Sequence, residues 1–123
     1  MIMRRILIAI LLTGALAGWG KTISNIDRNG AWYYIYDEKG KKSKAISANS
    51  IGVIKGWCGE FFIAQNGSWI GIYNPEGRKL KTMSKSSIGE VISVSGNTFT
   101  TRNGNWIYTY DSTGKKISTR PAR

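Results

Sequence analysis

The sequence predicts an all-β protein built from four-stranded repeat units. A 14-residue phrase begins at Asn29, Asn66 and Asn103, and reads N-G-x-W-x-x-x-Y-[DN]-x-x-G-[KR]-K each time, with a period of 37 residues. The register continues without insertion from residue 47 to residue 120. Short β-branched and aromatic runs alternate with glycine-containing turns, and no window after residue 17 has the 3.6-residue apolar period of a helix. We therefore expect repeated strands and no helix beyond residue 17.

Residues 1–17 have the pattern of a signal peptide. Arg4 and Arg5 precede the apolar run at residues 6–12, and a small-x-small site ends at Ala17. The apolar run is shorter than the roughly 20 residues that a membrane-spanning helix needs, so we expect cleavage rather than anchoring. This pattern predicts export to the periplasm or the cell exterior, and a single all-β repeat domain over residues 18–123.

The repeat divides this domain into an incomplete unit at residues 18–46 and full units at residues 47–83 and 84–120. Four strands are expected in each full unit, which in the third copy read "IGEVISV", "NTFTTR", "NWIYTYD" and "KKISTR". In the first unit, the position of the first strand would fall within the signal segment. About eleven strands are therefore expected.

Two kinds of turn recur in every unit. The Asn-Gly pairs are expected to form two-residue hairpin loops, because Asn and Gly tolerate the positive φ angles of a type I′ turn. These pairs are Asn29-Gly30, Asn66-Gly67 and Asn103-Gly104. In the later turn of the third unit, Asp111 is expected to accept backbone hydrogen bonds and Gly114 to adopt positive φ.

The phrase "WIYTYDSTGKKIST" resembles the third strand, turn and fourth strand of many β-propeller blades. "YIYDEKGKKSKAI" carries the same phrase, and "GIYNPEGRKLKTM" departs by Asn74 in place of Asp. The resemblance covers residues 22–120, implies propeller-like meanders and transfers no functional residue. A propeller needs at least about four blades, so a propeller-like chain is expected to form a homodimer or a hetero-assembly. The alternative is a β-trefoil, which would be closed as a monomer.

Composition argues against an enzyme. The chain has no histidine, which excludes a Ser-His-Asp triad and His-based zinc sites. Its one cysteine, Cys58, cannot form an intrachain disulfide or a Cys-rich metal site, and we expect it to be a buried thiol. The seven carboxylates either fit turns or are scattered without a motif. We predict no catalytic, metal-binding or cofactor-binding residue and no cofactor.

The charge predicts an anionic partner. Removal of residues 1–17 takes away two of the 18 basic residues and none of the seven acidic ones, so the net charge falls from +11 to +9. Such a charge favours an anionic protein or glycan, and export disfavours nucleic acid. Basic residues recur directly after the later turn of each unit and are predicted to form a contact rim: Lys41, Lys42, Arg78, Lys79, Lys115 and Lys116. Protection of edge strands is the alternative role for these residues.

Aromatic residues recur at matching positions as well. The equivalent sets are Trp32, Trp69 and Trp106, and Tyr36, Tyr73 and Tyr110. Within a unit the Trp and Tyr are four residues apart, so they share one face of the strand. We expect them to pack between units, and the alternative is a set of sugar-binding shelves. Trp57 has Val94 as its repeat equivalent and stands at a turn, so it is predicted to be an exposed contact.

These observations predict an exported, basic β-repeat binding or interaction module, acting as a subunit of a cell-envelope assembly or as a binder of a cell-envelope partner. One alternative is a lectin-like protein that uses the repeat aromatics to bind carbohydrate. The other is a binder of anionic envelope polymers.

Overall fold

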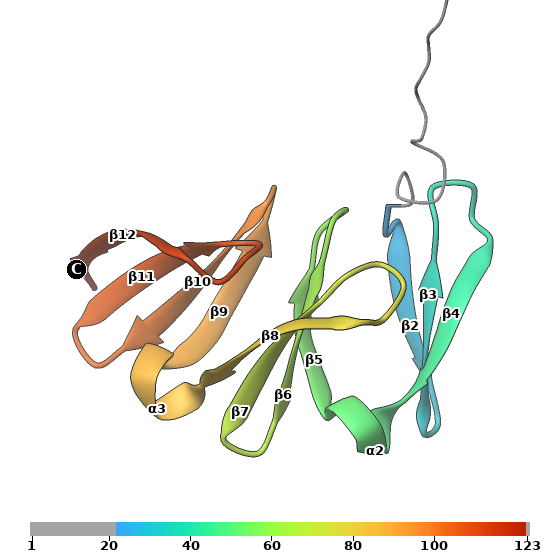
Figure 1. The fold of residues 1–123 in the computed structure, drawn as a ribbon, viewed down its shortest axis with the longest axis horizontal. Helices are drawn as coiled ribbons and strands as arrows, with labels where there is room; N and C mark the ends of the chain where they lie inside the picture. The colour runs from blue at the N-terminus through green and yellow to red at the C-terminus, as the bar shows by residue number, and fades with distance from the viewer. Residues whose placement is uncertain (1–21, 123) are drawn as a thin grey trace, which may run out of the picture.

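A computed structural model describes residues 22–122, so the predicted signal segment lies outside the described residues. Three antiparallel sheets, one from each repeat unit, lie side by side along the long axis of the molecule (Figure 1). The first sheet contains β2 (Asn25–Asn29), β3 (Trp32–Tyr36) and β4 (Lys42–Ser47). The second contains β5 (Val53–Trp57), β6 (Phe62–Asn66), β7 (Trp69–Tyr73) and β8 (Lys79–Ser84). The third contains β9 (Glu90–Ser95), β10 (Thr98–Asn103), β11 (Trp106–Asp111) and β12 (Lys116–Pro121).

Each sheet is a meander in which sequence neighbours pair in order. The eleven strands within residues 22–122 match the expected number, and among these described residues the first sheet has no strand that corresponds to β5 and β9. The prediction of an all-β fold with four-stranded repeat units is confirmed. Strands of the described range pair only within their own unit, so the sheets form no closed barrel and the β-trefoil alternative is not adopted.

Two apolar layers hold the three sheets together. The first layer lies between the first and second sheets and includes Ile35, Ile46 and Phe62. The second layer lies between the second and third sheets and includes Ile63 and Phe99. The second sheet is therefore covered on both faces, which explains why its sequence has a continuous apolar run rather than strict alternation.

The outer face of the third sheet is more polar than the equivalent face of the second. Ile63 and Ile72 are fully buried in the second sheet, and their repeat equivalents are Thr100 and Thr109, which are partly exposed. Polar side chains at these positions suit contact with water better than the buried isoleucines of the second sheet do.

The expectation of no helix beyond residue 17 is wrong. Two one-turn helices, α2 (Ala48–Ile51) and α3 (Lys85–Ile88), follow β4 and β8 and connect consecutive sheets (Figure 1). Four residues are too few to show an apolar helical period, so sequence patterning could not detect them. Gly52 and Gly89 end these helices with φ of 88° and 92°.

The Asn-Gly hairpins have two-residue loops with equivalent geometry, as predicted, but each loop begins one residue later. Asn29 still pairs with Trp32, so the first loop is Gly30-Ala31. The loop glycines of the three units have φ of 64°, 63° and 63°.

Two of these asparagines also bond through their side chains to the adjacent helices. Asn66 Nδ2 donates to the Ser50 carbonyl oxygen at 3.5 Å, and Asn103 Nδ2 donates to the Ser87 carbonyl oxygen at 3.1 Å. These bonds tie the hairpin side of the second and third sheets to α2 and α3, respectively.

The later turn of each unit has the predicted chemistry. Asp111 Oδ1 accepts hydrogen bonds from the backbone N–H groups of Thr113 and Lys115 at 2.9 and 3.0 Å, and Gly114 has φ of 86°. Asp37 and Asn74 accept the equivalent bonds in the other units. Asn74 keeps the turn because its amide oxygen accepts the same hydrogen bonds as a carboxylate.

Candidate binding site

The three repeat-equivalent tryptophans form what we call the tryptophan row: Trp32, Trp69 and Trp106. They are the first residues of β3, β7 and β11 and directly follow the Asn-Gly hairpins. The hairpins lie at the same edge of the molecule as α2 and α3 (Figure 1). Their exposed fractions are 46%, 58% and 48%. The expectation that they pack between units is therefore wrong, because the first strand position lies beyond the buried centre of each sheet.

The equivalent tyrosines behave differently. Tyr73 and Tyr110 are buried, and their rings lie 5.0 Å from Phe62 and 5.2 Å from Phe99 between centroids. Burial raises the pKa of both phenols. These two tyrosines have the packing role that was expected, whereas Tyr36 on the outer face of the first sheet is only partly buried.

The predicted basic rim is distributed as one pair of residues per sheet. Within each pair, the second residue is the first residue of the last strand of its sheet, as Lys42 is in β4 and Lys116 is in β12. Lys42 Nζ lies 4.1 Å from the centroid of the Tyr34 ring, and Lys116 Nζ lies 4.2 Å from that of Tyr108. Part of this set is therefore held against its own sheet by cation–π contacts.

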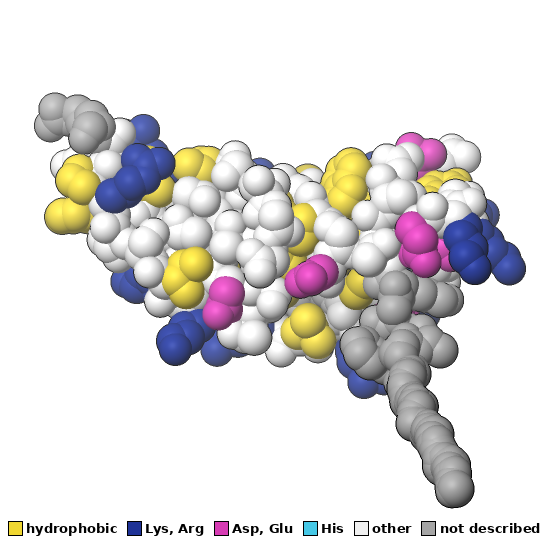
Figure 2. Space-filling view, turned by 90° about the horizontal axis from the view of Figure 1, so that it is seen from above, with side chains coloured by type: hydrophobic (Ala, Val, Ile, Leu, Met, Phe, Trp, Pro, Cys, Tyr) yellow, Lys and Arg dark blue, Asp and Glu magenta, His cyan; other side chains and the backbone are white. Residues whose placement is uncertain are grey.

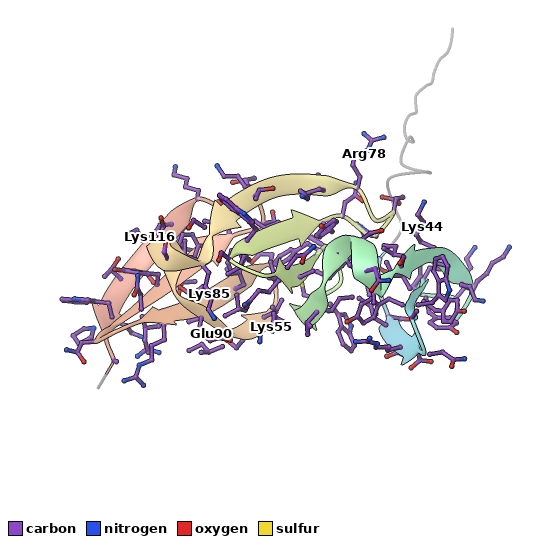
Figure 3. All side chains as sticks on the ribbon, turned by 90° about the horizontal axis from the view of Figure 1, so that it is seen from below. Lys44, Lys55, Arg78, Lys85, Glu90 and Lys116 are labelled. Carbon is purple, nitrogen blue, oxygen red and sulfur yellow. The ribbon has the colours of Figure 1, made fainter. Side chains whose placement is uncertain are left out.

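The basic residues do not gather at one point. Figure 3 shows Arg78 and Lys116 well separated along the long axis, and in Figure 2 the basic side chains of the visible face lie in several places. Lys41, Arg78 and Lys115 are exposed and stand in successive turns. Their contact with an anionic partner stays a prediction.

An ion-pair cluster lies where β5 and β9 meet. Lys55 Nζ is 3.1 Å and Lys85 Nζ is 3.0 Å from the Glu90 carboxylate oxygens (Figure 3). Hydrogen bonds from Lys85 and then Lys55 lower the pKa of Glu90. All three side chains are substantially exposed, so the cluster contributes little stability and serves as a link between the second and third sheets.

Trp57 is accessible, as predicted, but it is remote from the tryptophan row. It ends β5 with 38% of its surface exposed and pairs with Phe62, at the end of the second sheet opposite the hairpin. The adjacent Cys58 is half-buried rather than fully buried, and its thiol donates to the Phe61 carbonyl oxygen at 3.8 Å.

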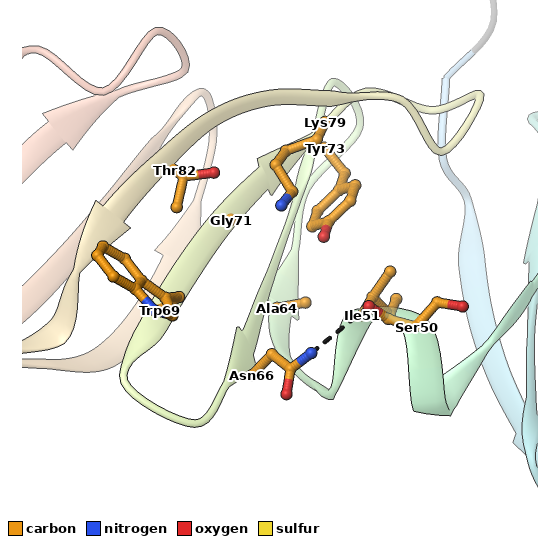
Figure 4. Close-up of a pocket in the computed structure, with 9 residues that line it drawn as sticks. All are labelled: Ser50, Ile51, Ala64, Asn66, Trp69, Gly71, Tyr73, Lys79 and Thr82. Carbon is orange, nitrogen blue, oxygen red and sulfur yellow. Dashed lines mark hydrogen bonds between the residues drawn. The ribbon is translucent and has the colours of Figure 1, made fainter.

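A pocket of about 490 Å³ opens on the face of the second sheet that is turned toward the first sheet (Figure 4). Strands β6, β7 and β8 and helix α2 supply its lining: Ser50, Ile51, Ala64, Asn66, Trp69, Gly71, Tyr73, Lys79 and Thr82. It brings one member of the tryptophan row, Trp69, together with one basic-rim residue, Lys79. Sequence reasoning missed this pocket because it depends on small residues, Ala64 and Gly71, and not on any motif.

The described residues offer no metal site. Among residues 22–122, no three His, Cys, Asp or Glu side chains are grouped so that they could hold a metal ion. Within the same range, no helix has the length and apolar character to cross a membrane.

No protein-family model matches the chain, and no curated protein matches it. One solved structure with a similar fold is "KlHsv2 with loop 6CD replaced by a Gly-Ser linker". The two share 14% sequence identity with a TM-score of 0.54, over 76% of this chain and 33% of that chain. The chain thus spans about a third of that structure's length. At this identity the likeness concerns the fold alone.

Proposed function

We propose that the chain is a non-enzymatic binding module that holds a protein partner in the cell envelope through the tryptophan row. The proposal rests on the observation that Trp32, Trp69 and Trp106 are all about half exposed at equivalent positions of adjacent sheets. Exposed large aromatics are informative because single-chain folding normally buries them, and Trp is enriched among the residues that dominate binding energy at interfaces.

A propeller-like arrangement of the sheets is part of this proposal. It is supported by three successive meanders and by the contact between the first strands of the two complete units, where Lys55 of β5 pairs with Glu90 of β9. Gly56 also lies against Val94 there. Three blade-like sheets would form an open arc, whose hairpin edge remains available to a partner.

Charge supports an acidic partner in an exported setting. The chain carries a formal net charge of +11, and Lys41, Arg78 and Lys115 extend this charge along successive exposed turns. Such a surface speeds association with an anionic protein and makes that association sensitive to salt.

Carbohydrate binding is the second candidate. It is favoured by the position of Trp69 beside polar groups of Asn66 and Ser50, since sugars combine apolar C–H faces with hydroxyls. A glycan array separates the candidates, because a protein-binding module would give no glycan signal above a denatured control.

The test begins with chemical cross-linking in envelope preparations, identification of the captured protein and its purification. Titration calorimetry then compares the wild type with a Trp32→Ala/Trp106→Ala double variant and with Trp57→Ala as the matched control. We expect the double variant to bind at least about thirtyfold more weakly, since truncating one interface hot spot costs about 2 kcal/mol or more. Trp57→Ala should bind as the wild type does. Normal binding by the double variant, with weakened binding by Trp57→Ala, would reject the tryptophan row as the contact surface.

A further inference from the structure

One position on the third strand of each unit differs between the middle repeat and the outer two. It is occupied by Tyr34, Gly71 and Tyr108 in the three units. In the first and third units the tyrosine ring lies beneath the ammonium group of Lys42 or Lys116, at 4.1 and 4.2 Å from its centroid. The middle unit lacks this ring.

A second side chain on the same face of the middle sheet is also shorter than its equivalent in the third unit. Thr101 of the third unit is fully buried, and its hydroxyl donates to the Ile88 carbonyl oxygen at 2.6 Å. The repeat equivalent in the second unit is Ala64, which has no hydroxyl. Ala64 and Gly71 line the same pocket, so both changes enlarge it (Figure 4).

The cation that would cover the absent ring is retained. Lys79 is the repeat equivalent of Lys42 and Lys116, and it borders the pocket with Tyr73 beside it (Figure 4). Among the described residues, no carboxylate pairs with its ammonium group and no ring lies beneath it. The middle unit therefore presents a lysine in the same position without the aromatic partner that this position has elsewhere.

Tyr73 takes up only part of the vacated space. A Cβ atom on Gly71 would lie 2.8 Å from Tyr73 Cε1, so this ring leans over the glycine. The Tyr73 ring makes an angle of 32° with Phe62, whereas Tyr110 stacks on Phe99 at 16°. About 490 Å³ remains, bounded on one side by the half-exposed indole of Trp69.

We propose that this pocket binds an aromatic side chain, tyrosine or phenylalanine, presented by the protein partner; this inference rests on the proposed function. The incoming ring takes the place that Tyr34 and Tyr108 occupy in the outer units, with one face beneath Lys79 and an edge against Trp69. Ile51 and Ala64 make part of the lining apolar, which would leave sugar hydroxyls there without hydrogen-bond partners.

The test uses N-acetyl-L-tyrosinamide as the probe and follows NMR chemical shifts of the Gly71 amide and the Trp69 indole. We expect saturable shifts in the wild type, weaker binding of N-acetyl-L-leucinamide and none of methyl glucoside. Gly71→Tyr should abolish probe binding, because it supplies the ring that the other units contain. Lys79→Gln should weaken binding about two- to fivefold, the factor for a cation–π contact at an exposed site.

Thr101→Ala/Tyr108→Gly is the matched converse variant, because it recreates both changes of the middle unit beneath Lys116 in the third sheet. It should gain a second site for the probe, detected at the Trp106 indole. Thermal unfolding checks that each variant is folded, and if Gly71→Tyr does not fold, Lys79→Gln and Thr101→Ala/Tyr108→Gly decide. Unchanged probe binding in Lys79→Gln with no gained site in Thr101→Ala/Tyr108→Gly would overturn the proposal, as would tighter binding of the glucoside than of the tyrosinamide.

The purified partner separates this inference from the proposed function. If Gly71→Tyr binds the partner normally while Trp32→Ala/Trp106→Ala does not, the aromatic pocket is rejected and the proposed function stands. If the double tryptophan variant binds normally, the tryptophan row is rejected, whatever the probe does at the pocket.

Discussion

Replacement of Gly89 by Ala should strongly destabilise the protein. Gly89 ends α3 with φ of 92° and ψ of −162°, a conformation that is essentially restricted to glycine. An added Cβ would also collide with the backbone carbonyl of Arg102 in β10. The collision can be relieved only by moving α3 away from this strand.

The expected loss has two parts. Holding alanine in such a backbone conformation costs about 1–3 kcal/mol. Moving α3 would break the hydrogen bonds from Thr101 to Ile88 and from Asn103 to Ser87, worth about 1 kcal/mol each. The total of about 3–5 kcal/mol is a large share of the 5–15 kcal/mol, roughly, that stabilises a typical domain.

Thermal unfolding measures this effect against a matched control. Gly104 also has positive φ, 63°, but a Cβ there would meet no atom within 4 Å. Gly104→Ala should therefore lose only about 1–2 kcal/mol, the cost of a left-handed alanine. At about 4–8 °C per kcal/mol, Gly89→Ala should lower Tm by at least about 12 °C. Equal losses in the two variants would refute the argument that close packing of α3 on β10 requires glycine.

Three other outcomes are expected. The triple variant Lys42→Glu/Lys79→Glu/Lys116→Glu should remain folded but lose binding to an anionic partner, and binding of the wild type should weaken steeply with salt. Unchanged affinity in the triple variant would leave protection of edge strands as the only role of these lysines. Hydrogen bonds from the Thr113 hydroxyl, and then from a backbone N–H, lower the pKa of Asp111. Its folded pKa is therefore below its unfolded pKa, so the stabilisation is present above about pH 4 and is lost as pH falls through the folded value. Plots of Tm against pH should consequently fall more steeply in acid for the wild type than for Asp111→Asn, and parallel plots would contradict this role. Sedimentation at micromolar concentration should give a dimer, because three blade-like sheets cannot close a propeller ring alone; a well-folded monomer would count against the propeller-like arrangement.

The elements that local chemistry determines could be predicted from the sequence. The 37-residue period gives the unit boundaries, and the Asx turn at Asp111 needs only a side-chain oxygen and a following glycine. The hairpin loops begin one residue later than predicted because each asparagine still pairs with the tryptophan across the loop, as Asn66 does with Trp69. One-turn helices are below the length at which periodicity is informative.

The candidate site was less predictable because it depends on tertiary packing. Alternation places Trp69 and Tyr73 on one face, but only the stacking of sheets determines that Tyr73 is buried and Trp69 half exposed. The pocket depends on Gly71, where the informative signal is a difference between repeats rather than a shared residue.

Fluorine NMR of protein labelled with 5-fluorotryptophan tests the central claim most directly, because it reports on each indole separately. The captured partner is purified and titrated into the labelled protein, with resonances assigned by single Trp→Phe variants. The tryptophan row predicts that the signals of Trp32, Trp69 and Trp106 shift or broaden together while that of Trp57 stays in place. A response of Trp57 alone, with the three row signals unchanged, would contradict it.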